Sequence, residues 1–184
     1  MKKEFLSVLT FLIISNLSVF AQKVYTKNGA ISFFSKAPVE NISAVNNQVM
    51  STLSLPGGEL QFSVLINAFH FKKSQMEEHF NENYMETDKF PKATFKGKIN
   101  DLSKINLTAD GSYPVQVTGE ITIHGVTKTI TTPGTISVKS GIITATSTFR
   151  VKPADHNISI PSIVKNNIAE VIDVTVSCIY NQTI

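Results

Sequence analysis

Four histidines carry the side chains best suited to metal binding or proton transfer: His70, His79, His124 and His156. Zinc sites often place two ligands a few residues apart on one helix face, as in H-x-x-x-H or H-E-x-x-H. No two of these histidines have that spacing. The sequence therefore predicts no metal site.

The candidate nucleophiles lead to a similar result. Cys178, the single cysteine, stands on the apolar face of a period-two run, where a free thiol acts as a small buried hydrophobe. Asp155-His156 is a loop dipeptide without a serine at a nucleophile elbow. We therefore expect no catalytic residues and no cofactor. A small hydrolase or isomerase acting on an apolar substrate stays an alternative, and it would need an acid, a base and a nucleophile that converge.

Charge argues against a nucleic-acid partner. The chain of 184 residues has a formal net charge of +3, and its lysines are scattered along the chain with acidic residues among them. Arg150 is the only arginine, so the usual bidentate reader of phosphates and bases is almost absent.

The first 21 residues have the layout of a secretory signal peptide. Lys2 and Lys3 precede an apolar run over residues 5–20, and residues 19–21 fit a small-x-small cleavage rule that leaves Gln22 first. Polar residues interrupt the run, whereas a membrane anchor needs about 18 uninterrupted apolar residues. We expect a signal peptide over 1–21, one domain over 22–184, and a periplasmic or secreted protein.

Alternation of apolar and polar residues runs through most of the remaining chain. The even-numbered residues of 59–68 and 172–178, and the odd-numbered residues of 113–123, are apolar or glycine. Such period-two patterns indicate strands with one buried face. His124-Gly125 and Ser140-Gly141 separate neighbouring runs and predict tight hairpin turns.

Helical patterns are scarce. Ser74 with Glu77 three residues later suggests a capping box, and Met76, Phe80 and Tyr84 follow at helical spacing. A second helical turn is expected around residues 161–167. Many short strands with one or two short helices predict an all-β fold, an extended antiparallel barrel of about eight strands. Such a barrel is just wide enough to be filled by side chains or to hold one small ligand.

The residues in 76–97, MEEHFNENYMETDKFPKATFKG, resemble the signature of the YceI-like family of polyisoprenoid-binding or lipid-binding periplasmic proteins. Three more stretches agree with it: GAISFFS at 29–35, GEITIHGVTK at 119–128, and Phe149 followed by ISIP at 158–161. The resemblance covers nearly the whole chain after the signal segment. It implies a lipocalin-like barrel with an isoprenoid-type or quinone-like lipid in an elongated apolar pocket.

Twelve phenylalanines and four methionines supply large apolar groups for such a pocket. We expect the pocket to be lined by apolar side chains from the strands and the helix, with two polar residues, His79 and Asn83, at its mouth. The apolar set is Phe33, Phe62, Val64, Ile66, Phe69, Met76, Phe80, Phe95, Ile121, Ile123 and Phe149. A simpler interpretation of His79 is a helix residue that packs partly inside.

Two further alternatives stay open from sequence. A barrel filled by its own side chains would be a structural or interaction module of the cell envelope. An integral outer-membrane barrel would need longer lipid-facing strands and aromatic girdles, which the sequence lacks. Peripheral contact with a membrane is compatible with a lipid carrier. The oligomeric state is left open, a dimer included.

Overall fold

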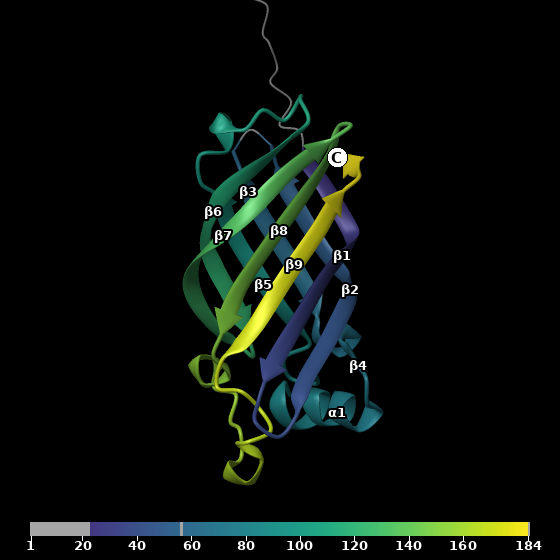
Figure 1. Ribbon diagram of the computed structural model, residues 1–184, viewed down its shortest axis with the longest axis vertical. Helices are drawn as coiled ribbons and strands as arrows, with labels where there is room; N and C mark the ends of the chain where they lie inside the picture. Colours follow the sequence, from purple (N-terminus) through teal and green to yellow (C-terminus); the bar gives the residue numbers. More distant parts are fainter. Residues whose placement is uncertain (1–22, 56, 184) are drawn as a thin grey trace, which may run out of the picture.

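The computed structural model describes residues 23–55 and 57–183, and most of them lie in one antiparallel sheet of order β10-β1-β9-β8-β7-β6-β5-β3-β2-β4. The strands are β1 (Lys23–Lys36), β2 (Asn41–Ser54), β3 (Glu59–Leu65), β4 (His70–Phe71), β5 (Lys92–Ile99), β6 (Gly111–Ile123), β7 (Val126–Lys139), β8 (Ile142–Val151), β9 (Ile172–Tyr180) and β10 (Gln182–Thr183). Because β1 pairs with both β9 and β2, eight strands close into a barrel (Figure 1). The predicted fold class is confirmed.

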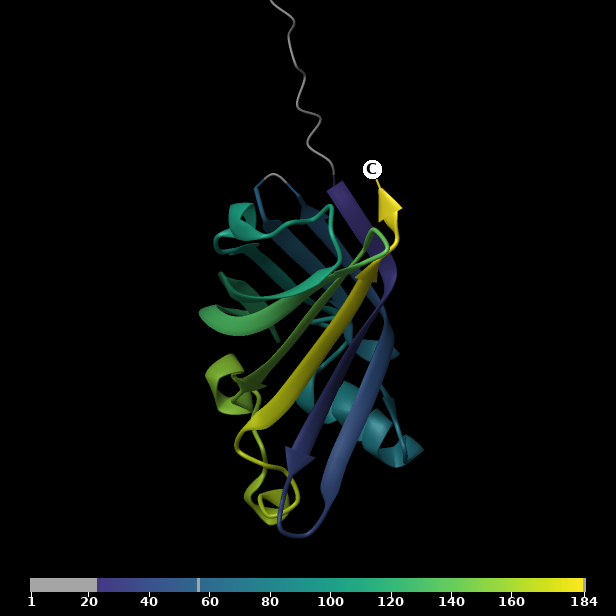
Figure 2. The same ribbon diagram turned by 45° about the horizontal axis from the view of Figure 1, so that its top comes forward.

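Short helical elements connect or cap the strands. The α-helix α1 (Ser74–His79) continues as a π-helical turn, η2 (Phe80–Tyr84). The 3₁₀ turns are η1 (Ile66–Ala68), η3 (Leu102–Lys104), η4 (Pro153–His156) and η5 (Ser162–Val164). Both views place α1 and the segment between β8 and β9 at one end of the barrel, which we call the α1 end (Figures 1 and 2). In the described part of the chain, no helix combines the length and apolar character that a membrane span requires.

Both predicted hairpins form, and each uses two residues with positive φ. His124 and Gly125 have φ of 49° and 74°, and Ser140 and Gly141 have φ of 50° and 79°. Two-residue turns with both central residues in this region match the right-handed twist of the strands they join. They fix the register of β6 on β7 and of β7 on β8.

The strand predicted over 59–68 ends earlier, at Leu65. The buried side chain of Asn46 donates from Nδ2 to the Leu65 carbonyl at 2.8 Å, and the Ile66 N–H donates to the Pro91 carbonyl at 3.0 Å. These bonds replace the strand ladder, so the chain turns into η1. Ile66 and Ala68 are nevertheless buried, as the alternating pattern indicated.

The predicted capping box is wrong. Lys73 is the N-cap residue, Ser74 is already helical, and no side chain caps this end. Glu77 instead accepts a hydrogen bond on Oε2 from the Phe71 N–H at 3.0 Å. Its other oxygen, Oε1, lies 3.5 Å from Nδ1 of His70. Glu77 therefore ties α1 to β4.

The end of the barrel opposite α1, which we call the packed end, is closed by a hydrophobic cluster. Its most deeply buried members include Leu53, Ile99, Ile136 and Cys178. A hydrogen bond of 2.7 Å joins the hydroxyls of Ser51 and Tyr180 there. This end gives the barrel a solid base.

Candidate functional site

Beyond the packed end the barrel is hollow. A cavity of about 410 Å³ lies inside it, within the range usual for small-molecule pockets. All eight strands of the barrel contribute to its lining, together with α1, η2 and the segment between β8 and β9. The lining is almost entirely apolar. A cavity with this lining can shield an apolar ligand from water.

The hollow follows from the size of the inward side chains. The inward positions of β7 and β8 at mid-height carry Thr132, Gly134, Ala145 and Ser147, and Gly134 pairs directly with Ser147. An eight-stranded barrel has just enough interior for side chains to fill it. Four small residues on two adjacent strands therefore leave unfilled volume.

The ring of Phe95 lies along the wall of the barrel and leaves the centre free. A Cβ added at Gly97 or Gly119 would lie 2.5 Å or 2.6 Å from its Cζ atom. These two glycines also pair with each other across β5 and β6. Their missing side chains make room for the ring against the wall.

The cavity is long in the strand direction. Val115 and Ile123 both line it and lie eight residues apart on β6. At about 3.3 Å per residue that separation is roughly 26 Å along the strand. The shape thus suits a chain more than a compact ring.

Four phenylalanines pack together where the cavity meets the α1 end. The ring of Phe33 lies 5.4 Å from Phe69, 5.6 Å from Phe71 and 5.5 Å from Phe80, measured between centroids. Phe80 in turn lies 5.0 Å from Phe71. Rings at these distances and tilted angles attract one another beyond their area burial. This aromatic cluster fixes η2 and β4 onto β1.

Polar residues also line the cavity at its α1 end. Glu40 from the β1–β2 connection, His79 from α1 and Asn167 from the β8–β9 segment line the cavity there. His79 is exposed, so it lies at the edge of the cavity. Asn83 is exposed and lies outside the lining.

The other twelve residues expected at the pocket all line the cavity. Their contact with a lipid stays a prediction. They are Phe33, Phe62, Val64, Ile66, Phe69, Met76, His79, Phe80, Phe95, Ile121, Ile123 and Phe149.

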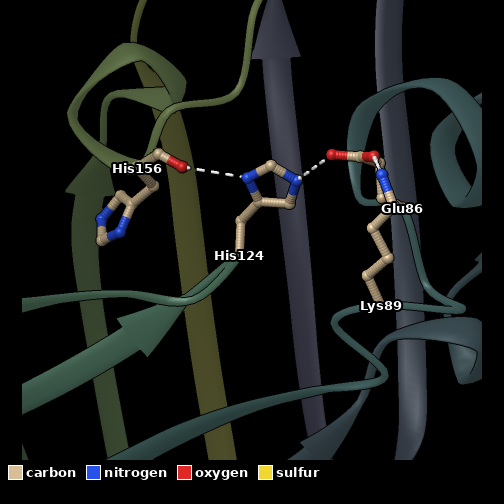
Figure 3. Close-up of polar contacts among 4 residues, drawn as sticks. All are labelled: Glu86, Lys89, His124 and His156. Atoms are coloured by element: carbon tan, nitrogen blue, oxygen red, sulfur yellow. Dashed lines mark hydrogen bonds and ion pairs between the residues drawn. The ribbon is translucent and has the colours of Figure 1, made fainter.

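His124 joins three segments at the α1 end, a role that its sequence position did not reveal (Figure 3). Its Nδ1 lies 3.2 Å from the His156 carbonyl and its Nε2 lies 3.0 Å from Oε2 of Glu86. A carbonyl and a carboxylate are both acceptors, so the ring bonds both at once when each nitrogen carries a proton. The ring also packs on Phe90, 4.4 Å between centroids. We call this contact set the histidine latch.

Electrostatics reinforce the latch. Hydrogen bonds from Lys89 and then from His124 hold the pKa of the Glu86 carboxyl below its ordinary value. His156, which is buried, bonds through Nδ1 to the Val126 carbonyl at 3.2 Å. The latch therefore connects the loop after η2, the β6–β7 turn and η4, which together cover the α1 end of the cavity.

The described part of the chain contains no cluster of three or more His, Cys, Asp or Glu side chains that could hold a metal ion. Burial raises the pKa of the Cys178 thiol to about 12. A thiol in that state is a poor nucleophile and a poor metal ligand.

A closed antiparallel barrel of eight strands with a long apolar cavity defines a lipocalin-like class of protein. Comparison with known families identifies the family within this class. Residues 16–179 match the YceI-like domain, so the chain belongs to that family.

Solved structures share the fold at low sequence identity. A polyisoprenoid-binding domain from Saccharophagus degradans has a TM-score of 0.74 at 17% identity, over 87% of this chain and 97% of that one. Burkholderia cenocepacia BcnA has a TM-score of 0.67 at 16% identity, over 83% and 96%. The YCEI protein of Campylobacter jejuni has a TM-score of 0.54 at 18% identity, over 99% of both chains. A search of curated proteins found no match.

Proposed function

We propose that this chain is a lipid-binding protein that holds a long-chain isoprenoid-type lipid, a prenyl lipid or a quinone, inside the barrel. The observation that carries the proposal is the apolar cavity of about 410 Å³ with a span of roughly 26 Å along β6. Membership of the YceI-like family supports it, as does the similarity to a domain described as polyisoprenoid-binding. Binding would serve transport, storage or sequestration, without chemical conversion of the lipid.

The apolar cavity can hold a hydrocarbon tail without a polar anchor inside it. Burying about ten methylene-sized groups yields roughly 8 kcal/mol at about 0.8 kcal/mol each. Immobilisation of the guest offsets part of this gain. The lining has few polar groups to satisfy, so a hydrocarbon chain leaves little polar surface unpaired.

Native mass spectrometry of protein expressed in bacteria and purified without detergent tests the proposal. We expect a bound mass in the range of a prenyl lipid or quinone, or uptake of geranylgeraniol by protein that is purified empty. Protein that arrives empty and also refuses geranylgeraniol and a ubiquinone would overturn the proposal. It would favour the envelope module without a ligand.

Export is part of the proposal. The predicted signal peptide, residues 1–21, lies outside the described residues, and its support is the sequence layout with Lys2 and Lys3 before an apolar run. N-terminal sequencing of protein recovered from the periplasm or medium should begin at Gln22. Full-length protein retained in the cytoplasm would contradict export.

Peripheral membrane contact is proposed at the α1 end. Val39 and Ile163 are 66% and 90% exposed there, and the Val39 N–H donates to the Asn166 carbonyl at 3.3 Å, so their segments adjoin. Exposed apolar side chains near the end of a lipid cavity could enter a bilayer surface. The variant Ile163→Ser should reduce co-flotation with phospholipid vesicles. Equal flotation of variant and parent protein would argue against this contact surface.

A further inference from the structure

The barrel wall is split between β7 and β8. The ladder between these strands runs from the hairpin only to the pair Gly134–Ser147. Beyond it, residues 126–133 of β7 pair with β6, and residues 148–151 of β8 pair with β9. In Figures 1 and 2 the two strands separate from their common hairpin towards the α1 end.

Pro133 accounts for the position of the split. It has no N–H and cannot donate to the next rung of the ladder. Its carbonyl instead accepts a hydrogen bond from the Ser147 hydroxyl at 2.7 Å, and the Thr132 hydroxyl lies 3.3 Å from the same Ser147 oxygen. These side-chain bonds satisfy the backbone where the ladder ends. The proline at position 133 therefore determines where the β7–β8 ladder ends.

A second, polar cavity of about 270 Å³ lies at this split. Four residues, Ile121, Ile130, Phe149 and Val151, line both it and the apolar cavity. These shared side chains lie between the apolar interior and the polar cavity, which we call the lateral groove.

The lateral groove carries an excess of positive charge. Lys128, Arg150 and Lys152 line it, with Asp155 as the one acidic residue. Arg150 also donates from Nε to Oδ1 of Asp173 at 3.1 Å. Among the ion pairs of the described residues, none includes Lys128 or Lys152.

Lys128 has an unusual position for a lysine. Side chains alternate along a strand, so Lys128 shares the face of Ile130 and Thr132, which line the apolar cavity. It pairs with Ile121, another residue of that lining. A cation on the inward face of a barrel strand, at the point where the wall opens, can meet the head of a guest whose tail lies inside.

We propose that the lateral groove binds the polar head of the lipid and that this head carries a phosphate or diphosphate group. The inference rests on the proposed lipid-binding function and narrows its ligand to an anionic prenyl lipid. The tail lies in the apolar cavity, the chain passes between β7 and β8, and Lys128 and Lys152 donate to the phosphate oxygens. Lysine ammonium groups bind phosphate as compact point charges with three donors each.

Two probes with one tail test the proposal: geranylgeranyl monophosphate and geranylgeraniol, titrated calorimetrically into the barrel without its signal segment. We expect the phosphate to bind at least about tenfold more tightly, because only the phosphate probe can accept charge-assisted hydrogen bonds from the lysines. The double variant Lys128→Gln/Lys152→Gln should remove this preference and leave geranylgeraniol binding unchanged. Lys139→Gln, on the same strand but outside both cavities, is the control and should behave as the parent.

The outcomes separate the two proposals. Equal binding of both probes to the parent protein, or an undiminished phosphate preference in the double variant, would overturn the head site and leave the lipid-binding function standing. If neither probe binds to the parent protein, the lipid-binding function itself is refuted. Inorganic phosphate alone should not displace geranylgeranyl monophosphate. Displacement by inorganic phosphate would show that the groove takes a free anion, and would overturn a site for a lipid head.

Discussion

Filling the cavity from its wall should abolish lipid binding without unfolding the barrel. Ala145 lies on the inward face of β8 and lines the cavity, with Gly134 and Ser147 as small neighbours. The variant Ala145→Phe places a phenyl ring in the volume that we assign to the lipid tail. Because Ala145 borders the unfilled cavity, the added ring can enter that volume with little displacement of its neighbours.

The size of the effect follows from the carbon atoms displaced. A phenyl ring occupies the place of about six methylene-sized groups, and at about 0.8 kcal/mol each their exclusion costs roughly 5 kcal/mol of binding. That loss corresponds to more than a thousandfold in Kd. Overpacking typically destabilises a tight core by about 1–3 kcal/mol, and we expect less than this for a ring that enters open volume.

The assay is uptake of geranylgeraniol, followed by native mass spectrometry and calorimetry, alongside thermal unfolding of each protein. Ala93→Phe repeats the test at another level of the cavity, where Ala93 pairs with Val64. Thr148→Phe is the matched control, because Thr148 lies on β8 with an exposed side chain outside the lining. If folded Ala145→Phe and Ala93→Phe proteins bind geranylgeraniol as well as the control does, the tail does not occupy this cavity.

Three further predictions concern the latch and the packed end. Because the pKa of Glu86 is lowered in the folded state, its contribution to stability is present above about pH 4.5 and is lost as the pH falls through the folded pKa. Thermal unfolding should therefore separate Glu86→Gln from the parent near pH 7, by a difference that shrinks as the pH falls below about 4.5. Cys178, with a pKa raised to about 12, should resist iodoacetamide until the protein is unfolded; rapid labelling of native protein would refute its burial. Gly29→Ala should destabilise by about 1–3 kcal/mol in urea, since its Cβ would lie 2.5 Å from the Cys178 sulfur; Cys178→Ala should restore part of the loss, and additive effects would contradict the contact.

Alternation made the barrel predictable. The odd-numbered residues of 113–123 and the even-numbered residues of 172–178 face inward in β6 and β9 as expected. Both Gly-containing turns lie where the sequence places them, since few other sequences tolerate two positive φ angles in succession. These features depend on neighbours in sequence, so the sequence reports them directly.

Features that depend on distant residues were not predictable. The ladder after Leu65 stops because Asn46, on another strand, bonds its carbonyl. His124 lies in the turn that the sequence predicts, yet it is 9% exposed and contacts Glu86 and the His156 carbonyl, both more than thirty residues away. No local pattern marks such a contact set, although a histidine before the turn glycine offers one polar group to be satisfied.

The lateral groove was missed for a related reason. Pro133 was visible in the sequence as a residue that cannot donate to a ladder, and the loss of the β7–β8 pairing beyond it could have been inferred. The gathering of Lys128 with Arg150 and Lys152 could not, because it requires the register of two strands joined by a distant hairpin.

Electron density inside the barrel is the most direct test of the central claim that its side chains leave room for an apolar chain. A crystal structure of protein purified without detergent and soaked with geranylgeraniol should show continuous tubular density running beside Ala145 towards Phe33. Side chains that meet across the interior, with no such density and no void to admit it, would contradict the account.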